Sequence, residues 1–195
     1  KSLCNRALIL QAQFPQIAIA ALSKTDDTDV LVSALQSSAP IINLGAAGTA
    51  MRFATAFFAA QPGREVVLTG SPRMVQRPIA DLVNALRQLG AHINYVGEDG
   101  FPPLKIIGQI LLGGSVEVNA TASSQFASAL LLVGPSMQNG LKLRFSGEVV
   151  SQSYLKMTVA LLRDLGVEVA QSETEITVAH AKNIAPKTYV VEADW

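Results

Sequence analysis

Apolar residues along the chain follow two alternating periods, and this alternation predicts a mixed α/β fold. Spacings of three and four residues predict amphipathic helices, whereas short runs rich in β-branched residues, bounded by Gly, Pro or charged residues, predict strands. The predicted helices cover residues 5–13, 29–36, 49–60, 79–89, 124–133 and 153–165. The predicted strands are "IAIAAL", "EVVLTG", "HINYVG", "LKIIG", "SVEVNA", "LKLRFSG", "VEVAQ", "EITVA" and "TYVVEA". Helices that alternate with strands are typical of the α/β class.

The order of these segments is repeated along the chain. A loop of small and polar residues, an apolar helix, a strand and a second helix that ends near "LG" begin at Leu44 and again at Thr121. The second helices can be compared directly, as "IADLVNALRQLGAHINYV" and "YLKMTVALLRDLGVEVAQ". The opening third, from "KSLCNRALIL" to "DVLVSALQ", is a shorter version. We therefore expect three related α/β units, at residues 1–44, 45–120 and 121–195.

Composition and charge exclude several classes of partner. The 195 residues, 49% of them hydrophobic, can bury the core of one large or two small domains. Fifteen basic residues balance fifteen acidic ones, so no long-range field favours nucleic acid or an anionic membrane. Any binding of an anion must depend on a local cluster of donors.

Few residues are available for metal or redox chemistry. Cys4 is the single cysteine, and His92 and His180 lie far apart in the sequence, so neither a disulfide nor a metal cluster is expected. No apolar stretch reaches the roughly 20 residues of a membrane helix, and no signal sequence opens the chain. We expect a cytoplasmic location. The first residue is not Met, and "VVEADW" at the end resembles a strand, so we also expect a piece of a longer polypeptide.

Each expected unit has small or hydroxyl-bearing residues where its first helix begins. The three segments are "KSLCNR", "GAAGT" and "TASSQ". A helix N-terminus presents unpaired N–H groups and a partial positive charge, which attract phosphate and carboxylate. For any one segment, an ordinary helix cap is the alternative. "GAAGTA" lacks the spacing of a dinucleotide-binding motif and the lysine of a phosphate-binding loop.

Several segments together resemble the enolpyruvyl transferases. They are "KSLCNRALIL", "DDTDVLVSAL", "GAAGTAMR", "LTGSPRMVQRPIADLVNALRQLGA", "PPLKIIG", "SSQFASALLL", "VVSQSYLKMTVALLRDLGV" and "TYVVEAD", and they follow the family order over nearly the whole chain. "GSPRM", "RPI" and "SSQF" are the most specific, and they favour the branch that acts on shikimate 3-phosphate, the 5-enolpyruvylshikimate-3-phosphate synthases.

This resemblance implies a fold of two lobes, each built of three repeated α/β units whose helix N-termini point into the cleft between the lobes. The 195 residues would form almost one whole lobe, and the second lobe would be the partner missing from this chain. The family transfers the enolpyruvyl group of phosphoenolpyruvate to the 5-hydroxyl of shikimate 3-phosphate and releases phosphate, with no metal or organic cofactor. The reaction belongs to the shikimate pathway of aromatic amino-acid biosynthesis.

The resemblance also assigns substrate-binding residues. Those implied for shikimate 3-phosphate are Ser2, Arg6, Ser123, Ser124, Gln125, Ser151 and Tyr154. Those implied for phosphoenolpyruvate are Lys1, Gly48, Thr49, Arg77 and, shared by both substrates, Gln125. In this list Arg6 pairs with the shikimate carboxylate and Arg77 grips a phosphate, because a planar guanidinium can pair bidentately. The sequence departs from the common family pattern at Ala46, where many members carry Asn.

No catalytic residue is assigned to this chain. The family's acid and base groups belong to the lobe that would follow, so we expect the 195 residues alone to be inactive. For Arg52 and Arg73 we favour structural ion pairs, and for Cys4 simple packing. "KTDDTD" is interpreted as a helix cap. The alternatives for function are the sister transferase that acts on UDP-N-acetylglucosamine and a catalytically silent anion-binding module.

Overall fold

All six predicted helices are present in the computed structural model, which describes residues 2–20, 25–119, 124–147, 152–182 and 184–191. The helices are α1 Ser2–Gln13, α2 Asp26–Gln36, α3 Gly48–Ala59, α4 Ala80–Gln88, α5 Ser124–Val133 and α6 Gln152–Asp164, with a short 3-10 turn, η1, at Gly134–Ser136. Observed ends differ from the predicted ones by at most three residues. The apolar spacing therefore locates each α-helix of the described residues.

The nine predicted strands are also present, and the structure adds one that the sequence did not reveal. The strands are β1 Ile17–Ala20, β2 Ile41–Asn43, β3 Glu65–Thr69, β4 His92–Tyr95, β5 Leu104–Ile107, β6 Gly114–Asn119, β7 Leu141–Ser146, β8 Val169–Gln171, β9 Glu175–Val178 and β10 Lys187–Val190. The missed strand is β2. It has three residues, of which only Ile42 is buried, and this is too short for an alternating pattern.

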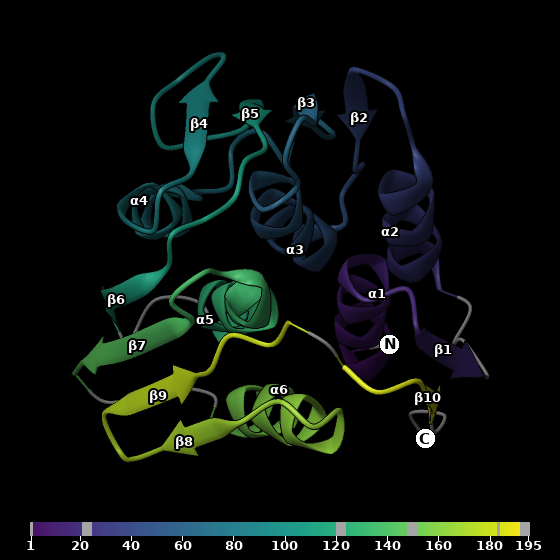
Figure 1. The fold of residues 1–195 in the computed structure, drawn as a ribbon. Coiled ribbons are helices and arrows are strands. Elements are labelled where there is room, and N and C mark those ends of the chain that lie inside the picture. The colour runs from purple at the N-terminus through teal and green to yellow at the C-terminus, as the bar shows by residue number, and fades with distance from the viewer. Residues whose placement is uncertain (1, 21–24, 120–123, 148–151, 183, 192–195) are drawn as a thin grey trace.

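Two of the three sheets formed by the described residues have the same topology. Their strand orders are β2-β3-β5-β4 and β6-β7-β9-β8, and in each the first pair is parallel while the other pairs are antiparallel. The third sheet, as far as the structure describes the chain, pairs β1 with β10, which run parallel. Figure 1 shows the sheets at the outside of the molecule and the helices between them.

An equivalent arginine supports the idea of a repeated unit. Arg87 on α4 donates through Nε and Nη2 to the carbonyl of Ile93, and Arg163 on α6 donates in the same way to Val169. β2 and β6 each pair in parallel with the strand that follows them in the chain. We propose that the second and third units begin with β2 and β6, rather than at residues 45 and 121.

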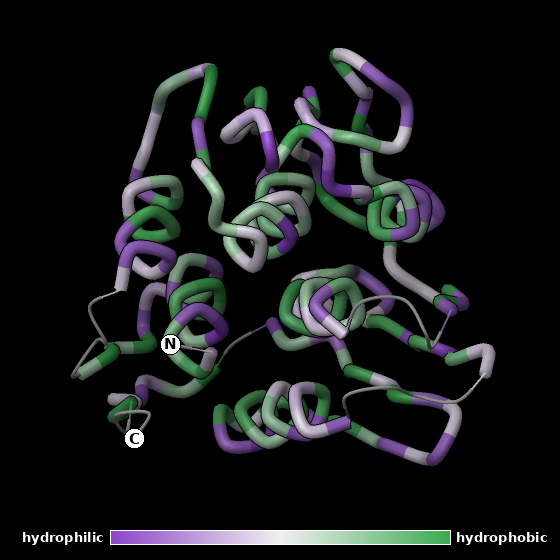
Figure 2. Tube along the Cα trace, turned by 180° about the vertical axis from the view of Figure 1, so that it is seen from behind, coloured by the Kyte–Doolittle hydropathy of each residue, from purple (hydrophilic) through white to green (hydrophobic). Residues whose placement is uncertain are grey.

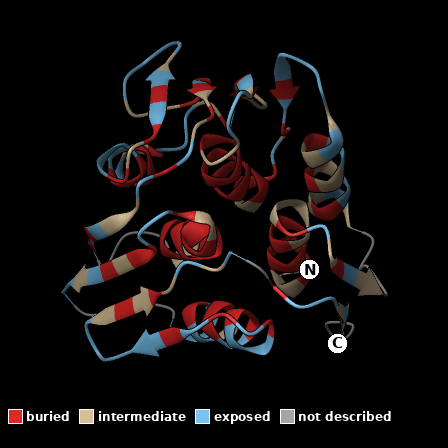
Figure 3. Cartoon of the chain, viewed as in Figure 1, coloured by how far each residue is buried: buried red, intermediate tan, exposed pale blue. Residues whose placement is uncertain are grey.

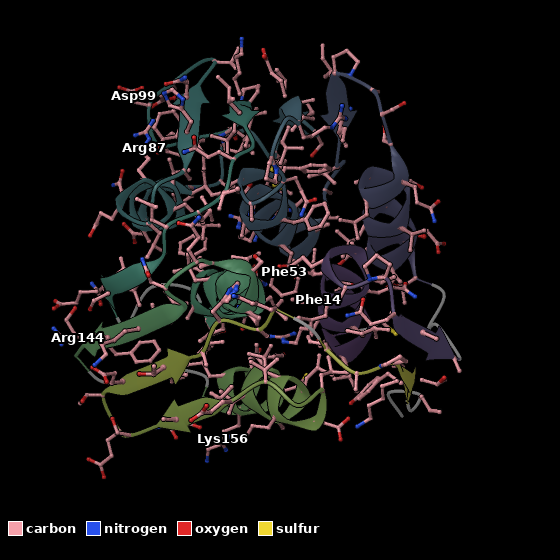
Figure 4. All side chains as sticks on the ribbon, in the orientation of Figure 1. Phe14, Phe53, Arg87, Asp99, Arg144 and Lys156 are labelled. Carbon is pink, nitrogen blue, oxygen red and sulfur yellow. The ribbon has the colours of Figure 1, made fainter. Side chains whose placement is uncertain are left out.

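The core lies around helices that are buried on nearly all sides. Every residue of α3 except Thr49 is buried, and so is every residue of α5 from Phe126 to Val133 (Figure 3). In Figure 2 the tube of α5 is largely hydrophobic, whereas α6 alternates between hydrophilic and hydrophobic residues. Figure 4 shows Phe53 among the central helices and Lys156 at the periphery. Within the described ranges, no helix is both long and apolar enough to span a bilayer.

Two predictions about local packing are confirmed. The Thr25 hydroxyl caps α2 by accepting a hydrogen bond from the Thr28 amide at 3.3 Å, and three acidic residues occupy the first turn of that helix. These charges complement the positive end of the helix dipole. Cys4 is fully buried in α1. The acidic cluster therefore stabilises a helix start, and the cysteine packs in the interior.

Candidate anion-binding site

The N-terminal turns of α3, α5 and α6 and the second turn of α1 are joined by side-chain contacts. Gln125, at the start of α5, donates through Nε2 to the Thr49 hydroxyl at the start of α3, at 3.2 Å. Arg6, in the second turn of α1, lies 5.7 Å from the ring centre of Tyr154 in the first turn of α6. Each helix N-terminus carries a partial positive charge, so this side of the molecule favours anions.

The N-terminus of α3 has no side-chain cap. Its N-cap residue, Ala47, makes no side-chain hydrogen bond, and its first turn contains no acidic residue. By contrast, α2 is capped by Thr25 and carries three aspartates. The first N–H groups of α3 therefore have no partner within the helix and can donate to a ligand.

Arg77 lies directly against this uncapped turn. A Cβ atom placed on Gly48 would come within 2.8 Å of Arg77 Cζ and 2.9 Å of its Nη2, so only glycine lets the guanidinium approach this closely. The loop that carries Arg77 is tied to the α3 loop, because the Ser71 amide donates to the Gly45 carbonyl at 2.9 Å. The Arg77 side chain is exposed. Gly48 and Arg77 thus form one surface with a cation and N–H donors.

Two hollows flank Arg77. The first, of about 370 Å³, is lined by Arg52, Arg77, Pro78, Ala80, Asp81, Gln125 and Phe126. The second, of about 430 Å³, is lined by Ala46, Ser71, Arg73, Met74 and Arg77. Ala46 is exposed here and offers no side-chain donor, so the departure from the common family pattern lies in the wall of the second hollow.

Arg52 is buried at the first hollow, with 4% of its surface exposed. Its guanidinium donates to the carbonyls of Gly48 and Pro78, at 3.3 and 3.1 Å. Burial, together with the nearby charge of Arg77, lowers the pKa of Arg52 to about 10, so it is a cation at neutral pH. Among the described residues its partners are carbonyls and a sulfur atom rather than a carboxylate, so the expected ion pair is wrong.

Arg6 forms the other charged part of the site, 2% exposed. Its Nε donates to the Thr158 hydroxyl at 2.7 Å, its Nη1 to the Ser2 carbonyl at 2.8 Å, and its Nη2 to the Ser128 hydroxyl at 3.0 Å. The guanidinium lies 5.4 Å from the ring centre of Phe53. Burial lowers the pKa of Arg6 to about 10, and the nearby Tyr154 acts in the opposite direction.

The structure brings together part of the set expected from the sequence. Arg77 contacts Gly48, and Gln125 donates a hydrogen bond to Thr49. Gly48 and Thr49 are the first two residues of α3, so these four residues form one group. Lys1, Ser123 and Ser151 lie outside the described residues. Ser124 is half-buried at the first position of α5, and Tyr154 is 44% exposed.

Sequence reasoning missed the residues that hold Arg6. Thr158 and Ser128 are fully buried in α6 and α5, and Phe53 is fully buried in α3. Each occupies an apolar face of its helix, where a hydroxyl or a ring is ordinary packing. Only the contact between helices distant in sequence reveals that these side chains surround a buried cation.

Comparison with known proteins identifies the family. Its sequence profile, that of EPSP synthase (3-phosphoshikimate 1-carboxyvinyltransferase), matches residues 16–195. A 3-phosphoshikimate 1-carboxyvinyltransferase of Bacteroides fragilis strain YCH46 is 44% identical over 100% of this chain and 48% of the relative. One from Tolumonas auensis is 42% identical over 83% of this chain and 38% of the relative.

The fold is found in a solved structure as well. EPSP synthase from Acinetobacter baumannii superposes with a TM-score of 0.80 at 22% identity, covering 98% of this chain and 48% of that one. The chain thus has the fold of one lobe of an enolpyruvyl transferase, and it spans about half the length of the relatives that it matches. By its sequence profile and its fold, this chain belongs to the EPSP synthase (3-phosphoshikimate 1-carboxyvinyltransferase) family.

Proposed function

We propose that this chain is the substrate-binding half of a 3-phosphoshikimate 1-carboxyvinyltransferase. The complete protein would transfer the enolpyruvyl group of phosphoenolpyruvate to the 5-hydroxyl of shikimate 3-phosphate and release phosphate. Family membership supports the reaction, and the cluster of helix N-termini and guanidinium groups supports binding of two multiply charged anions. A cytoplasmic location remains a prediction.

The observation that carries the proposal is the contact between Arg77 and Gly48. An exposed guanidinium beside uncapped N–H groups suits a phosphate, which can accept several charge-assisted hydrogen bonds at once. We assign phosphoenolpyruvate to this place, with Gly48, Thr49, Arg77 and Gln125 as its ligands. Lys1 belongs to the same proposed group.

Shikimate 3-phosphate is assigned to the neighbouring turns of α1, α5 and α6. The hydrogen bonds of Arg6 to described residues use Nε, both N–H groups of Nη2 and one N–H group of Nη1, which leaves one of the five guanidinium N–H donors for a carboxylate. The Tyr154 ring is exposed beside it and can cover an apolar ring face. Ser2, Ser123, Ser124, Gln125 and Ser151 complete the proposed set.

Catalysis is assigned to a second lobe of the same polypeptide. The reaction protonates the methylene carbon of phosphoenolpyruvate and removes a proton from the attacking hydroxyl, so it needs an acid and a base. No carboxylate of this chain lies in a family motif for those roles. Closure of two lobes over the substrates would bring these groups to them and exclude water.

The test is phosphate release by the complete protein when both substrates are supplied. We expect turnover with both substrates and none when shikimate 3-phosphate is replaced by UDP-N-acetylglucosamine. Arg77→Ala should raise the KM for phosphoenolpyruvate by at least about tenfold, which corresponds to the loss of one charge-assisted contact of about 1.5 kcal/mol or more. A complete protein that binds both anions without releasing phosphate would instead be a silent binding module.

A further inference from the structure

We propose that Arg52 is a positioning residue for the phosphoenolpyruvate site, although it is no member of the substrate-binding set implied by the family resemblance. Its buried guanidinium holds both sides of the Arg77–Gly48 contact and adds a second positive charge to the hollow beside it. The inference rests on the proposed function, because it assigns phosphoenolpyruvate to that hollow.

The first contact fixes the orientation of the α3 N-terminus. Arg52 Nη1 donates to the carbonyl of Gly48 at 3.3 Å. In a trans peptide the carbonyl and the following N–H belong to one rigid plane and point in opposite directions. Holding the Gly48 carbonyl therefore also sets the direction of the Thr49 N–H, one of the donors that the helix leaves without a partner.

The remaining polar contacts fix the loop that carries Arg77. Arg52 Nη2 donates to the carbonyl of Pro78 at 3.1 Å, and Nη1 lies 3.5 Å from the Met74 sulfur. These two residues lie on either side of Arg77 in sequence. One planar side chain thus joins the helix start to the loop, and a flexible cation with a single nitrogen cannot replace that span.

The charge of Arg52 is a reason to expect a bound anion. The side chain is 4% exposed, its described polar partners are neutral, and the Phe126 ring centre lies 5.8 Å from its Cζ. A buried cation without a counter-charge is costly, and a second guanidinium nearby adds to that cost. Arg52 and Arg77 line the same hollow of about 370 Å³ together with one carboxylate, that of Asp81, and a phosphate dianion would offset the positive charge that remains.

A second arginine, the half-buried Arg64 beyond the opposite end of α3, provides a control. Arg64 also donates only to carbonyls within the described chain, those of Ser37, Ser38 and Ala39, and it lies 5.8 Å from the ring centre of Phe58. It follows the C-terminus of α3, whereas Arg52 lies in the second turn of that helix. Replacing either arginine by lysine removes the same kind of contact, but only Arg52 adjoins the site.

The experiment compares Arg52→Lys and Arg64→Lys in the complete protein by steady-state kinetics and thermal unfolding. We expect Arg52→Lys to raise the KM for phosphoenolpyruvate by about tenfold and to change the KM for shikimate 3-phosphate by less than twofold. Arg64→Lys should leave both constants within twofold. Arg52→Met, which removes the charge as well, should raise the KM for phosphoenolpyruvate further than Arg52→Lys does. If Arg52→Met does not fold, the comparison of Arg52→Lys with Arg64→Lys tests the inference.

Two outcomes separate this inference from the proposed function. If Arg52→Lys lowers the unfolding temperature as Arg64→Lys does, yet leaves the KM for phosphoenolpyruvate within twofold of the original protein, then Arg52 is only structural and the inference is overturned. If Arg77→Ala also leaves that constant unchanged, the anion site itself is misassigned, and the proposed function fails with it.

Discussion

Gly48→Ala provides a sharp test of the Arg77 contact, because it adds a single methyl group. The new Cβ would come within 2.8 Å of Arg77 Cζ, whereas ordinary carbon contacts are about 3.5–4.0 Å. Nη1 of Arg77 would lie closer still, so the guanidinium must withdraw by at least about 1 Å. This movement costs little free energy of folding, since the Arg77 side chain is flexible and exposed. This displacement moves the Arg77 guanidinium away from the position in which it could donate hydrogen bonds to a phosphate at the α3 N-terminus.

The expected effect falls on binding rather than on stability. Loss of one charge-assisted bond to phosphate costs about 1.5–3 kcal/mol, which predicts a KM for phosphoenolpyruvate raised roughly 10- to 100-fold. Alanine stabilises a helix relative to glycine by at most about 1 kcal/mol, and Gly48 is already helical. The unfolding temperature of Gly48→Ala should therefore not fall. The KM for shikimate 3-phosphate should change by less than twofold.

The assay is steady-state phosphate release by the complete protein, arranged as a double-mutant cycle with Arg77→Ala. If Gly48→Ala acts by displacing Arg77, then its effect on phosphoenolpyruvate should be small once Arg77 is absent, and the two changes should be strongly non-additive. Additive effects, or an unchanged constant in the single variant, would show that the methyl group does not act through the guanidinium.

Further predictions concern both substrates, the support of Arg6 and the division into lobes. Replacing Ser123 and Ser124 with Ala should weaken binding of shikimate 3-phosphate at least about tenfold by calorimetry, because each phosphate contact contributes about 1.5–3 kcal/mol; an unchanged dissociation constant would contradict the assignment. Arg77→Lys keeps the charge but loses the planar fork, so kinetics should show a raised KM for phosphoenolpyruvate and not for shikimate 3-phosphate alone. Thr158→Val leaves Arg6 Nε without its acceptor and should lower the free energy of unfolding by about 1.5–3 kcal/mol in urea, more than Thr55→Val does. The 195-residue chain should unfold cooperatively and release no phosphate until a separately produced second lobe is added; turnover by the chain alone would show that the catalytic groups are misplaced.

The sequence by itself determined the helices, most strands and the family. Helical spacing is a property of neighbouring residues, so each apolar face was visible, and the Thr25 cap with its acidic turn was predicted correctly for the same reason. The segments "GAAGTAMR" and "RPI" identified Gly48 and Arg77 as candidates because they follow a family pattern. Such signals are local, or depend on resemblance, and need no knowledge of packing.

Only the tertiary structure determined which partners the buried arginines contact. Arg52 and Arg6 could have formed surface ion pairs, but the fold buries both and gives them neutral partners from distant segments, such as Pro78 and Thr158. The strand β2 likewise depends on its parallel neighbour, since three residues carry no periodic signal. A buried guanidinium is stable only where acceptors from several elements converge on it, and that convergence is set by the packing of helices far apart in the chain.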